Sequence, residues 1–553
     1  MMHMKQPIAA FLAFSFLAIT LLTGCSGKRV GDIVLDYEAL NAQALEESLV
    51  PVHPGVKGEV PFWNKYSFKF SHAPVFDFDD VEGAEGYIFT VKKDDEEFTF
   101  ESDSPRSPLS EIWNGIPSGK VVLTVQGHDG NGNAVGEPMT RGFEKDSPFH
   151  GPYPEADKGY LESAIFAAEG AHRSFMVQNW FTGDLEHFYE LNGYPCKIWS
   201  ATIQNECFLA SHKPELKDSA LAAARIIADS LMKMSRPADA PLAYFPPTYY
   251  RRAGYDGGII KGTLDDNENL TMFVEAVCAA KALLDLYDLC GEKKYFDFAC
   301  NIASTYRKTQ NADGSWPVKA NFITGEPFTD APCMPTTILQ LAQRLQDQYG
   351  VKGYEEMLSR SEKWLWDNIL ATFNFNGQFE DVHVRDKSPF QNLTNCTAAD
   401  CVDYFLGKKN PSKQEIEVCA EIARFVDDQF TYWNSPTNQY LKIRFNEDIV
   451  PFYRPYVYEQ YSYLCPIDHS TSGVAMAWMR VFKATGDKLA LAKAKALMNT
   501  IILSQDPVSG IIPTGLINEN YTFGNGVHEI WMNCSYQSIT ALSRMEALLC
   551  EKL

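Results

Sequence analysis

The spacing of apolar residues divides the chain into a strand-rich part and a longer helical part. Between residues 66 and 126, short aromatic and β-branched runs are broken by turn residues such as Glu82-Gly83, a pattern typical of β-strands. Beyond Gly159, apolar residues recur at helical spacing, most clearly in the stretch 270–289, which ends at Gly291. The pattern predicts a small β-sandwich followed by a mainly α-helical region.

The helical part contains a repeat. The interval from a turn glycine to a glutamine is 19 residues twice, from Gly291 to Gln310 and from Gly486 to Gln505. Weaker copies of the same two-helix unit run through Pro214, Gly350 and Gly407. This period indicates five αα-hairpins.

Two helical segments remain outside these hairpins, one near 159–173 and one near 532–549. If they pair, twelve helices form six hairpins and close an (α/α)6 toroid; an open solenoid is the alternative. Turns within the units are short and links between units are long, so antiparallel packing gathers the links on one face. We expect the functional groups in these links.

The same patterns predict the domain organisation. We expect a signal peptide over 1–24, a tether over 25–58, a β-sandwich over 59–144, a Pro- and Gly-rich linker over 145–158 and the toroid over 159–553.

Charge narrows the class of partner. Acidic residues outnumber basic ones by 71 to 49 in 553 residues, which gives a net charge of −22. Such a chain has no electrostatic attraction to the phosphates of nucleic acid, so we expect no nucleic-acid partner. We also expect no cofactor. We expect no metal ion at His528, since the residue four positions later is Met532 and not a second histidine.

The N-terminus has the features of an export signal. Lys5 precedes the apolar run 8–22, which ends at Leu22-Thr23-Gly24-Cys25. This tetrapeptide resembles the bacterial lipobox, which implies a lipidated Cys25 as the first mature residue; an ordinary signal peptide with a chance cysteine is the alternative. No later stretch has 18 consecutive apolar residues. We therefore expect a monomer in the bacterial cell envelope, joined to the membrane only through Cys25.

The predicted links hold aromatic residues beside charged ones, the combination that binds sugar rings and their hydroxyl groups. Structural roles compete: Glu268 can cap a helix, Trp316 can close its repeat, and Tyr456 can pack in an interface. The substrate-binding candidates are Tyr249, Arg251, Arg252, Glu268, Trp316, Arg385, Arg454, Tyr456, His528 and Glu529.

Two resemblances add to this picture. The stretches 74–87 and 116–121 resemble a fibronectin type III domain, which implies a spacer or binding module. The lipobox, this module, the turn Gln-Asn-Ala-Asp-Gly-Ser-Trp-Pro at 310–317 and Thr-Gly-Asp at 485–487 together resemble the six-hairpin glycosidase-like superfamily. Its members include exported glycan-degrading lipoproteins of Gram-negative bacteria, among them uronic-acid-releasing hydrolases, polysaccharide lyases and uronyl epimerases.

Three functions remain open. A glycoside hydrolase acting on uronic-acid-containing glycans needs two carboxyl groups, for which we predict Asp381 and Glu459, while arginines hold the substrate carboxylate. A lyase or epimerase needs a base beside a neutralised carboxylate, and His383, Tyr458 and His469 fit that role. A glycan-binding lipoprotein without turnover is the third possibility.

Overall fold

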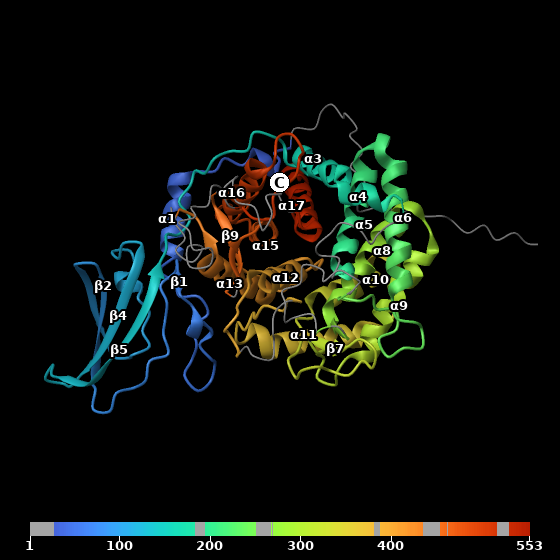
Figure 1. Ribbon diagram of the computed structural model, residues 1–553. Coiled ribbons are helices and arrows are strands. Elements are labelled where there is room, and N and C mark those ends of the chain that lie inside the picture. Colours follow the sequence, from blue (N-terminus) through green and yellow to red (C-terminus); the bar gives the residue numbers. More distant parts are fainter. Residues whose placement is uncertain are drawn as a thin grey trace, which may run out of the picture.

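The computed structural model describes residues 27–182, 194–249, 267, 269–380, 388–434, 454–461, 463–516 and 530–553. Its larger part is a ring of helical hairpins, each with an inner helix that faces the ring axis and an outer helix that covers it (Figure 1). The inner helices are α5 (Pro195–His212), α8 (Ala276–Cys290), α10 (Thr336–Tyr349), α12 (Asn395–Leu406), α15 (Asp468–Thr485) and α17 (Met532–Cys550). Their outer partners are α6 (Lys217–Met234), α9 (Lys293–Thr309), α11 (Glu355–Leu365), α13 (Lys413–Phe430), α16 (Lys488–Ser504) and α3 (Tyr160–Arg173).

The ring closes through the two ends of the helical region. Helix α17 packs against α3 to form the sixth hairpin, and it also contacts α5 and α15 on either side. The predicted (α/α)6 toroid is therefore confirmed. Closure buries the apolar faces that an open array would expose at its ends.

Glycine sets the short turns of three hairpins. Gly291, Gly350 and Gly486 end α8, α10 and α15 with φ of 70°, 69° and 75°. This left-handed conformation costs other residues free energy because of their Cβ atom, so glycine stops the helix and turns the chain back.

The repeated glutamines join neighbouring hairpins. Gln310 donates to the carbonyl oxygens of Gly314 (3.2 Å) and of Met357 in the next outer helix (2.9 Å). Gln505 donates in the same way to Gly510 (2.8 Å) and to Ser163 in α3 (2.9 Å). The 19-residue repeat seen in the sequence thus marks a hydrogen-bonded clasp between successive units.

The strand-rich region forms one five-stranded sheet in the order β1-β5-β4-β2-β3. Strands β2, β3, β4 and β5 pair antiparallel, whereas β1 runs parallel to β5. The strands are β1 (Lys69–Phe70), β2 (Gly86–Lys93), β3 (Glu96–Ser102), β4 (Gly119–His128) and β5 (Ala134–Lys145). They project from the side of the ring (Figure 1).

The second layer of this region differs from the facing sheet that a fibronectin type III fold implies. Phe76, from a segment without strand pairing, and Trp113, from the short helix α2 (Ser110–Trp113), both pack on Phe143 of β5, at ring distances of 5.6 and 6.2 Å. Large aromatic side chains from a short helix and from a segment outside the strands therefore cover this face of the sheet, where a fibronectin type III fold has a second sheet.

The segment expected as a tether packs on the toroid from Gly27 onward. Helix α1 (Tyr37–Glu47) buries Leu40 and Ala44, contacts α16, and reaches the turn before that helix through a hydrogen bond from Gln43 to Asp487 (3.1 Å). The described part of the predicted tether, residues 27–58, therefore packs on the ring, because these apolar side chains find a surface to cover.

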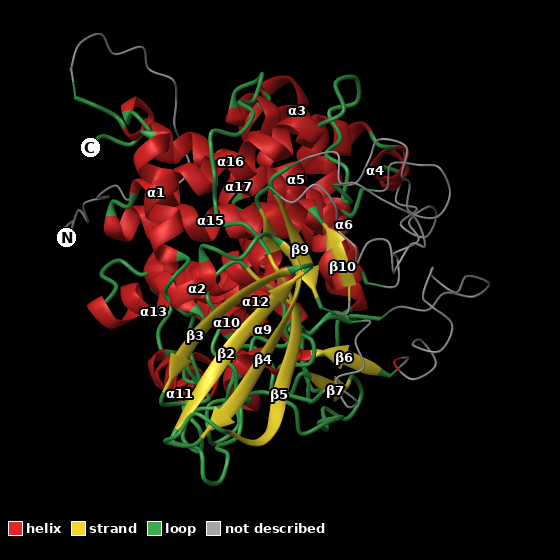
Figure 2. Cartoon of the chain, turned by 90° about the vertical axis from the view of Figure 1, so that its left-hand side faces the viewer, coloured by secondary structure: helices red, strands yellow, loops and turns green. Residues whose placement is uncertain are grey.

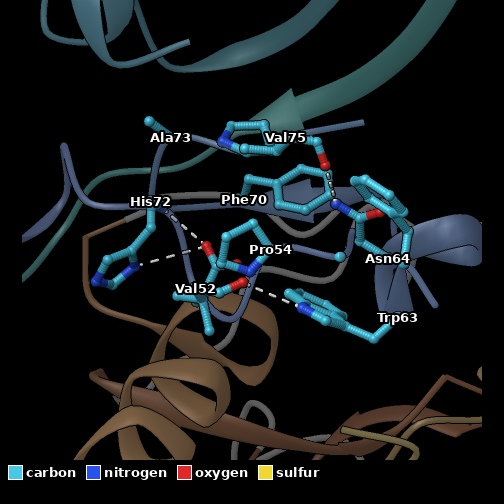
Figure 3. A pocket seen from close by; sticks show the side chains of 12 residues that line it. Val52, Pro54, Trp63, Asn64, Phe70, His72, Ala73 and Val75 are labelled. Carbon is cyan, nitrogen blue, oxygen red and sulfur yellow. Dashed lines mark hydrogen bonds and ion pairs between the residues drawn. The ribbon is translucent and has the colours of Figure 1, made fainter. Parts of the chain in front are cut away.

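Buried charges fasten the sheet to the ring. Lys69, whose side chain is fully buried, donates to the carbonyl oxygens of Asp428 (2.8 Å) and Thr431 (2.7 Å) at the end of α13 and lies 3.3 Å from Asp146. The Asp428 carboxylate accepts from the backbone of Ser71 and His72. A cavity of about 10 Å³ beside this junction has room for a single water molecule (Figure 3).

In the part of the chain that the structure describes, no helix is long and apolar enough to cross a membrane.

Candidate functional site

The N-terminal ends of the inner helices meet at one end of the ring, the site face. The short strands β6 (Leu270–Met272), β7 (Lys319–Asn321), β9 (Tyr456–Gln460) and β10 (Tyr463–Pro466) lie at this end, on the right in Figure 2, with β8 (Thr431–Tyr432) paired to β9. Because each inner helix follows a link between units, its first turn presents side chains to the same space. The short turns, by contrast, follow the C-terminal ends of the inner helices.

An ion pair occupies this end of the ring. Lys197, in the first turn of α5, donates to the carboxylate of Glu380. Burial opposes the charge on Lys197, but the charge of Glu380 outweighs it, so the pKa of Lys197 lies well above the ordinary value. The backbone carbonyl of Glu380 accepts from Tyr249 (2.6 Å) and Lys319 (3.1 Å), which fixes the chain at this point.

Glu275 stands at the start of α8 beside this pair. Its side chain is buried, and burial together with the charge of Glu380 raises its pKa to about 8, against the smaller opposing effect of Lys197. Glu275 is therefore protonated at neutral pH, whereas Glu380 carries the negative charge of an ion pair.

Asp468 and His469 open helix α15. Burial raises the pKa of Asp468 well above its usual value, although its carboxylate accepts from the His469 amide (2.8 Å) and from Ser538 (3.1 Å). Burial, with a smaller effect of the Lys197 charge, lowers the pKa of His469 to about 4. His469 is half-buried, so it offers a neutral imidazole to the space at the ring end.

Strand β9 divides the predicted tyrosine-rich loop between two faces. Tyr456 and Tyr458 are fully buried beside Tyr432, with ring distances of 5.5 and 4.9 Å to it. Glu459 points to the other face, because side chains alternate along a strand. Burial raises the pKa of Cys396 and Cys534 at the N-terminal ends of inner helices, and the Glu459 charge adds to this effect. Glu459 therefore joins the site, whereas Tyr458 lies in the packing between β8 and β9.

The structure also assigns other predicted residues to packing. Trp316 is fully buried, and its indole N–H donates to the Tyr306 carbonyl (2.9 Å), so its ring is not available for stacking on a sugar. Asp313 and Asp330 line a surface cavity of about 240 Å³ over the same turn. Arg454 is half-buried and lies close to Tyr456. Burial raises the pKa of Tyr456, and the Arg454 charge opposes this only in part.

Several predicted residues lie outside the described part of the chain. They are Cys25, Arg251, Arg252, Glu268, Asp381, His383, Arg385, His528 and Glu529.

Three residues of the site were not among the sequence candidates: Lys197, Glu275 and Glu380. Each has a weak local signal, since Lys197 follows a helix-starting proline, Glu275 is a lone acid before an apolar helix, and Glu380 precedes the predicted Asp381. Only the closed ring brings them together, because they belong to different repeat units.

Below the site the ring is closed by further ion pairs. Asp403 of α12 accepts from Arg480 of the neighbouring helix α15 (2.8 Å) and from Arg544 of α17, the next inner helix beyond it (2.9 Å). These contacts hold its pKa below the ordinary value although burial acts in the opposite direction. Asp400, one turn nearer the site, has a pKa raised to about 6 by burial. The described residues contain no group of three or more His, Cys, Asp or Glu side chains that could hold a metal ion.

Fold and site together define a helical toroid that gathers ionisable side chains at one end of its ring. No protein-family model matches the chain, and no curated protein is similar to it in sequence.

Three solved structures with a similar course of the chain are two hydrolases and a sugar epimerase. A family 76 glycoside hydrolase from a bovine Bacteroides thetaiotaomicron strain covers 86% of this chain and 95% of its own, with a TM-score of 0.42 and 9% identity. An unsaturated glucuronyl hydrolase specific for heparin covers 70% and 96%, with a TM-score of 0.43 and 10% identity. Cellobiose 2-epimerase from Spirochaeta thermophila covers 70% and 97%, with a TM-score of 0.48 and 12% identity. At these identities no residue role is carried over to this chain.

Proposed function

We propose that this protein is a glycan-active enzyme of the cell envelope, and specifically a glycoside hydrolase acting on uronic-acid-containing glycans. The observation that carries the proposal is the raised pKa of the buried Glu275 carboxyl group at the ring end. Hydrolysis of a glycosidic bond needs one protonated carboxyl group to donate to the leaving oxygen and one carboxylate to activate water or attack the anomeric carbon. Glu275 supplies a proton at neutral pH, and Glu459 is the half-buried carboxylate on the ring side of β9.

The surroundings suit an acidic sugar. The first turns of the inner helices direct their unpaired N–H groups and the positive ends of their dipoles toward this space. Lys197 and Lys319 add two ammonium groups near Glu380, so a substrate carboxylate would find cations at the site. Trp531, half-buried immediately before α17, is an aromatic surface on which a sugar ring can stack.

A second candidate rests on His469. A neutral imidazole is a base, and a base is what a polysaccharide lyase or a uronyl epimerase needs to take the proton next to a carboxylate. His469 is neutral above about pH 4, and Lys197 nearby would stabilise the negative charge that forms. Tyr458, the other base considered for this reaction, is buried on the opposite face of β9.

The decisive experiment follows two signals from one incubation. A soluble form without the anchor, residues 26–553, is mixed with a panel of uronic-acid and neutral glycans, while new reducing ends and absorbance near about 235 nm, from the alkene that a lyase leaves, are recorded. Reducing ends without absorbance support the hydrolase. Reducing ends with rising absorbance would replace it by a lyase. Silence in both signals would favour an epimerase or a binding lipoprotein.

Variants test the roles of the residues. We expect Glu275→Gln and Glu459→Gln each to lower kcat by about 10²–10⁴-fold, the usual contribution of a positioned acid or base. Glu356→Gln, at an exposed position of α11, is the matched control and should retain full activity. Activity should fall above about pH 8, as Glu275 loses its proton. Loss of activity with His469→Gln but not with Glu275→Gln would transfer the reaction to the second candidate.

We also propose that Cys25 carries the acyl chains that attach the protein to the membrane. Its support is the lipobox-like sequence Leu22-Thr23-Gly24-Cys25 after an apolar run. Intact-mass measurement of the N-terminal peptide from the full chain, expressed in a Gram-negative host, tests this attachment.

A further inference from the structure

We propose that the toroid lies on an anionic lipid bilayer with its turn face against the membrane and its site face pointing away. The turn face consists of the segments 27–29, 213–217, 291–294, 350–353, 407–413, 486–488 and 551–553, at the C-terminal ends of the inner helices. The proposal rests on the acyl anchor at Cys25 but does not depend on the reaction that the site catalyses.

The first described residues are fastened to the C-terminal end of α17. The Leu553 amide donates to the carbonyl of Lys28 (3.0 Å), and the Val30 amide donates to the carbonyl of Glu551 (2.9 Å). The backbones of Arg29 and Lys552 form an antiparallel β-bridge. A Cβ atom at Gly31 would lie 3.1 Å from the Leu549 carbonyl, so the two backbones approach closely. In Figure 2 the C-terminus and α1 lie on the left, and β6, β7 and β10 lie on the right.

This attachment leaves the anchor little freedom. Only Ser26 separates Cys25 from Gly27, and an extended chain spans at most about 3.5 Å per residue. Helix α17 has 19 residues and, at about 1.5 Å per residue, is about 28 Å long. Its first turn is at the site face and its last turn holds residues 27–31, so acyl chains on Cys25 enter the bilayer next to the turn face.

The charge of the turn face supports the same orientation. Its segments contain twelve Lys and Arg but four Asp and Glu, although the whole chain carries −22. Ten of these twelve basic residues are exposed, and Lys213 and Lys408 are half-buried in ion pairs. Within the described residues, no ion pair joins Lys217, Lys352, Lys409, Lys488 or Lys552 to an acid.

These exposed ammonium groups fit the phosphates of an anionic lipid surface. Helix α1 touches the turn at Asp487 and places acidic side chains at the edge of the turn face. The contact with the lipid is therefore made by the lysines of the turns and not by α1. One lipid anchor together with a basic surface gives stable membrane attachment. The site face then opens about 28 Å above the bilayer, toward glycans that arrive from the solvent.

Lysine reactivity tests the orientation. The lipoprotein produced from the full chain is reconstituted in vesicles of phosphatidylethanolamine and phosphatidylglycerol, treated with a water-soluble amine-acetylating reagent, and analysed by peptide mass spectrometry. The soluble form 26–553, mixed with the same vesicles, is the reference. We expect acetylation at Lys217, Lys352, Lys409 and Lys488 to slow by about fivefold or more in the lipoprotein, since these groups lie within a Debye length of the lipid. Lys92 and Lys120, exposed on the sheet, are the internal controls and should be unchanged.

Two results would overturn the proposal. Equal slowing at the turn and sheet lysines would mean that the body has no fixed orientation, and unchanged rates at the turn lysines would mean that this face points away from the lipid. A missing acyl group in the intact mass would also overturn it, because the anchor would be absent. The glycan incubation with the soluble form decides the enzymatic function independently of all three results.

Discussion

The carboxyl group of Glu275 keeps its proton at neutral pH because it is buried and Glu380 lies nearby. In the unfolded chain the same group loses its proton near pH 4.5. Between these values the folded state binds one more proton than the unfolded state, so this group lowers stability as the pH rises from about 4.5 to about 8. A buried carboxyl group with a pKa shifted in this way is a candidate for a functional role.

This linkage makes a prediction that needs no substrate. We expect Glu275→Gln to be more stable relative to the parent at pH 8 than at pH 5, because the amide has no proton to lose on unfolding. Urea unfolding at the two pH values measures the difference. Glu356→Gln, at an exposed position, should show no such change. A pH-independent effect of Glu275→Gln would mean that Glu275 is ionised in the folded protein.

Trp531 gives a second prediction at the residue scale. We expect Trp531→Ala to raise KM by about tenfold with a smaller change in kcat, since removal of a stacking surface weakens binding in the ground state and the transition state alike. Trp531→Phe should retain most of the affinity because it keeps an aromatic face. Steady-state kinetics on the best glycan of the panel checks this, and equal effects of the two substitutions would argue against stacking.

Among the elements of the ring, the clasps after α9 and α16 are the repeated feature. Gly314 and Gly510 have φ of 97° and 81°, and Cβ atoms there would lie 2.4 Å from the Arg360 carbonyl and 2.3 Å from the Phe166 carbonyl. Glycine at these positions lets each loop touch the next outer helix. The clasp therefore depends on both the glutamine and the glycine that follows it.

Two glycines with similar backbone conformation separate strain from crowding. Gly486 has φ of 75°, but a Cβ atom there would have no neighbour within 4 Å, so Gly486→Ala should cost about 1 kcal/mol for the left-handed backbone alone. Gly510→Ala meets the Phe166 carbonyl as well, and we expect it to cost about 2–4 kcal/mol. Chemical denaturation of both variants gives the comparison. Equal losses would show that the loop moves away from α3 without penalty.

At the scale of the whole molecule, buried charges join the sheet to the ring. We therefore expect the sheet and the ring to unfold as one unit. Lys69 comes from the sheet, and its partners Asp428 and Thr431 come from the ring. Removing one member of a buried charge network leaves the others without compensation, which typically costs about 3–5 kcal/mol. We therefore expect the sheet and the ring to lose their structure together.

Calorimetry tests this continuity. We expect the parent to unfold in a single transition and Lys69→Met to lower the transition temperature while keeping it single. Lys65→Met, at an exposed position four residues earlier, should leave the temperature within about 1 °C. Two separate transitions in the parent would contradict the coupling of sheet and ring.

The sequence by itself determined the repeat, the glycine-ended turns and the strand-rich start, because apolar periodicity and turn chemistry act over a few residues. Closure of the ring, which the sequence left open beside a solenoid, was decided by the packing of α17 on α3. Glu459 and His469 were also predicted in this way, since each stands among polar or aromatic neighbours at the start or edge of an element. Tyr458 and Trp316 have the same kind of neighbours, yet both side chains are fully buried.

Tertiary structure alone decided which of these side chains meet. Lys197, Glu275 and Glu380 belong to three different parts of the sequence, and ring closure brings them into electrostatic contact. Burial there is a property of the assembled ring, and burial is what sets the protonation of Glu275 and His469. The course of residues 27–58 over the toroid was decided in the same way, because a local pattern records that a side chain is apolar but not which distant surface will cover it.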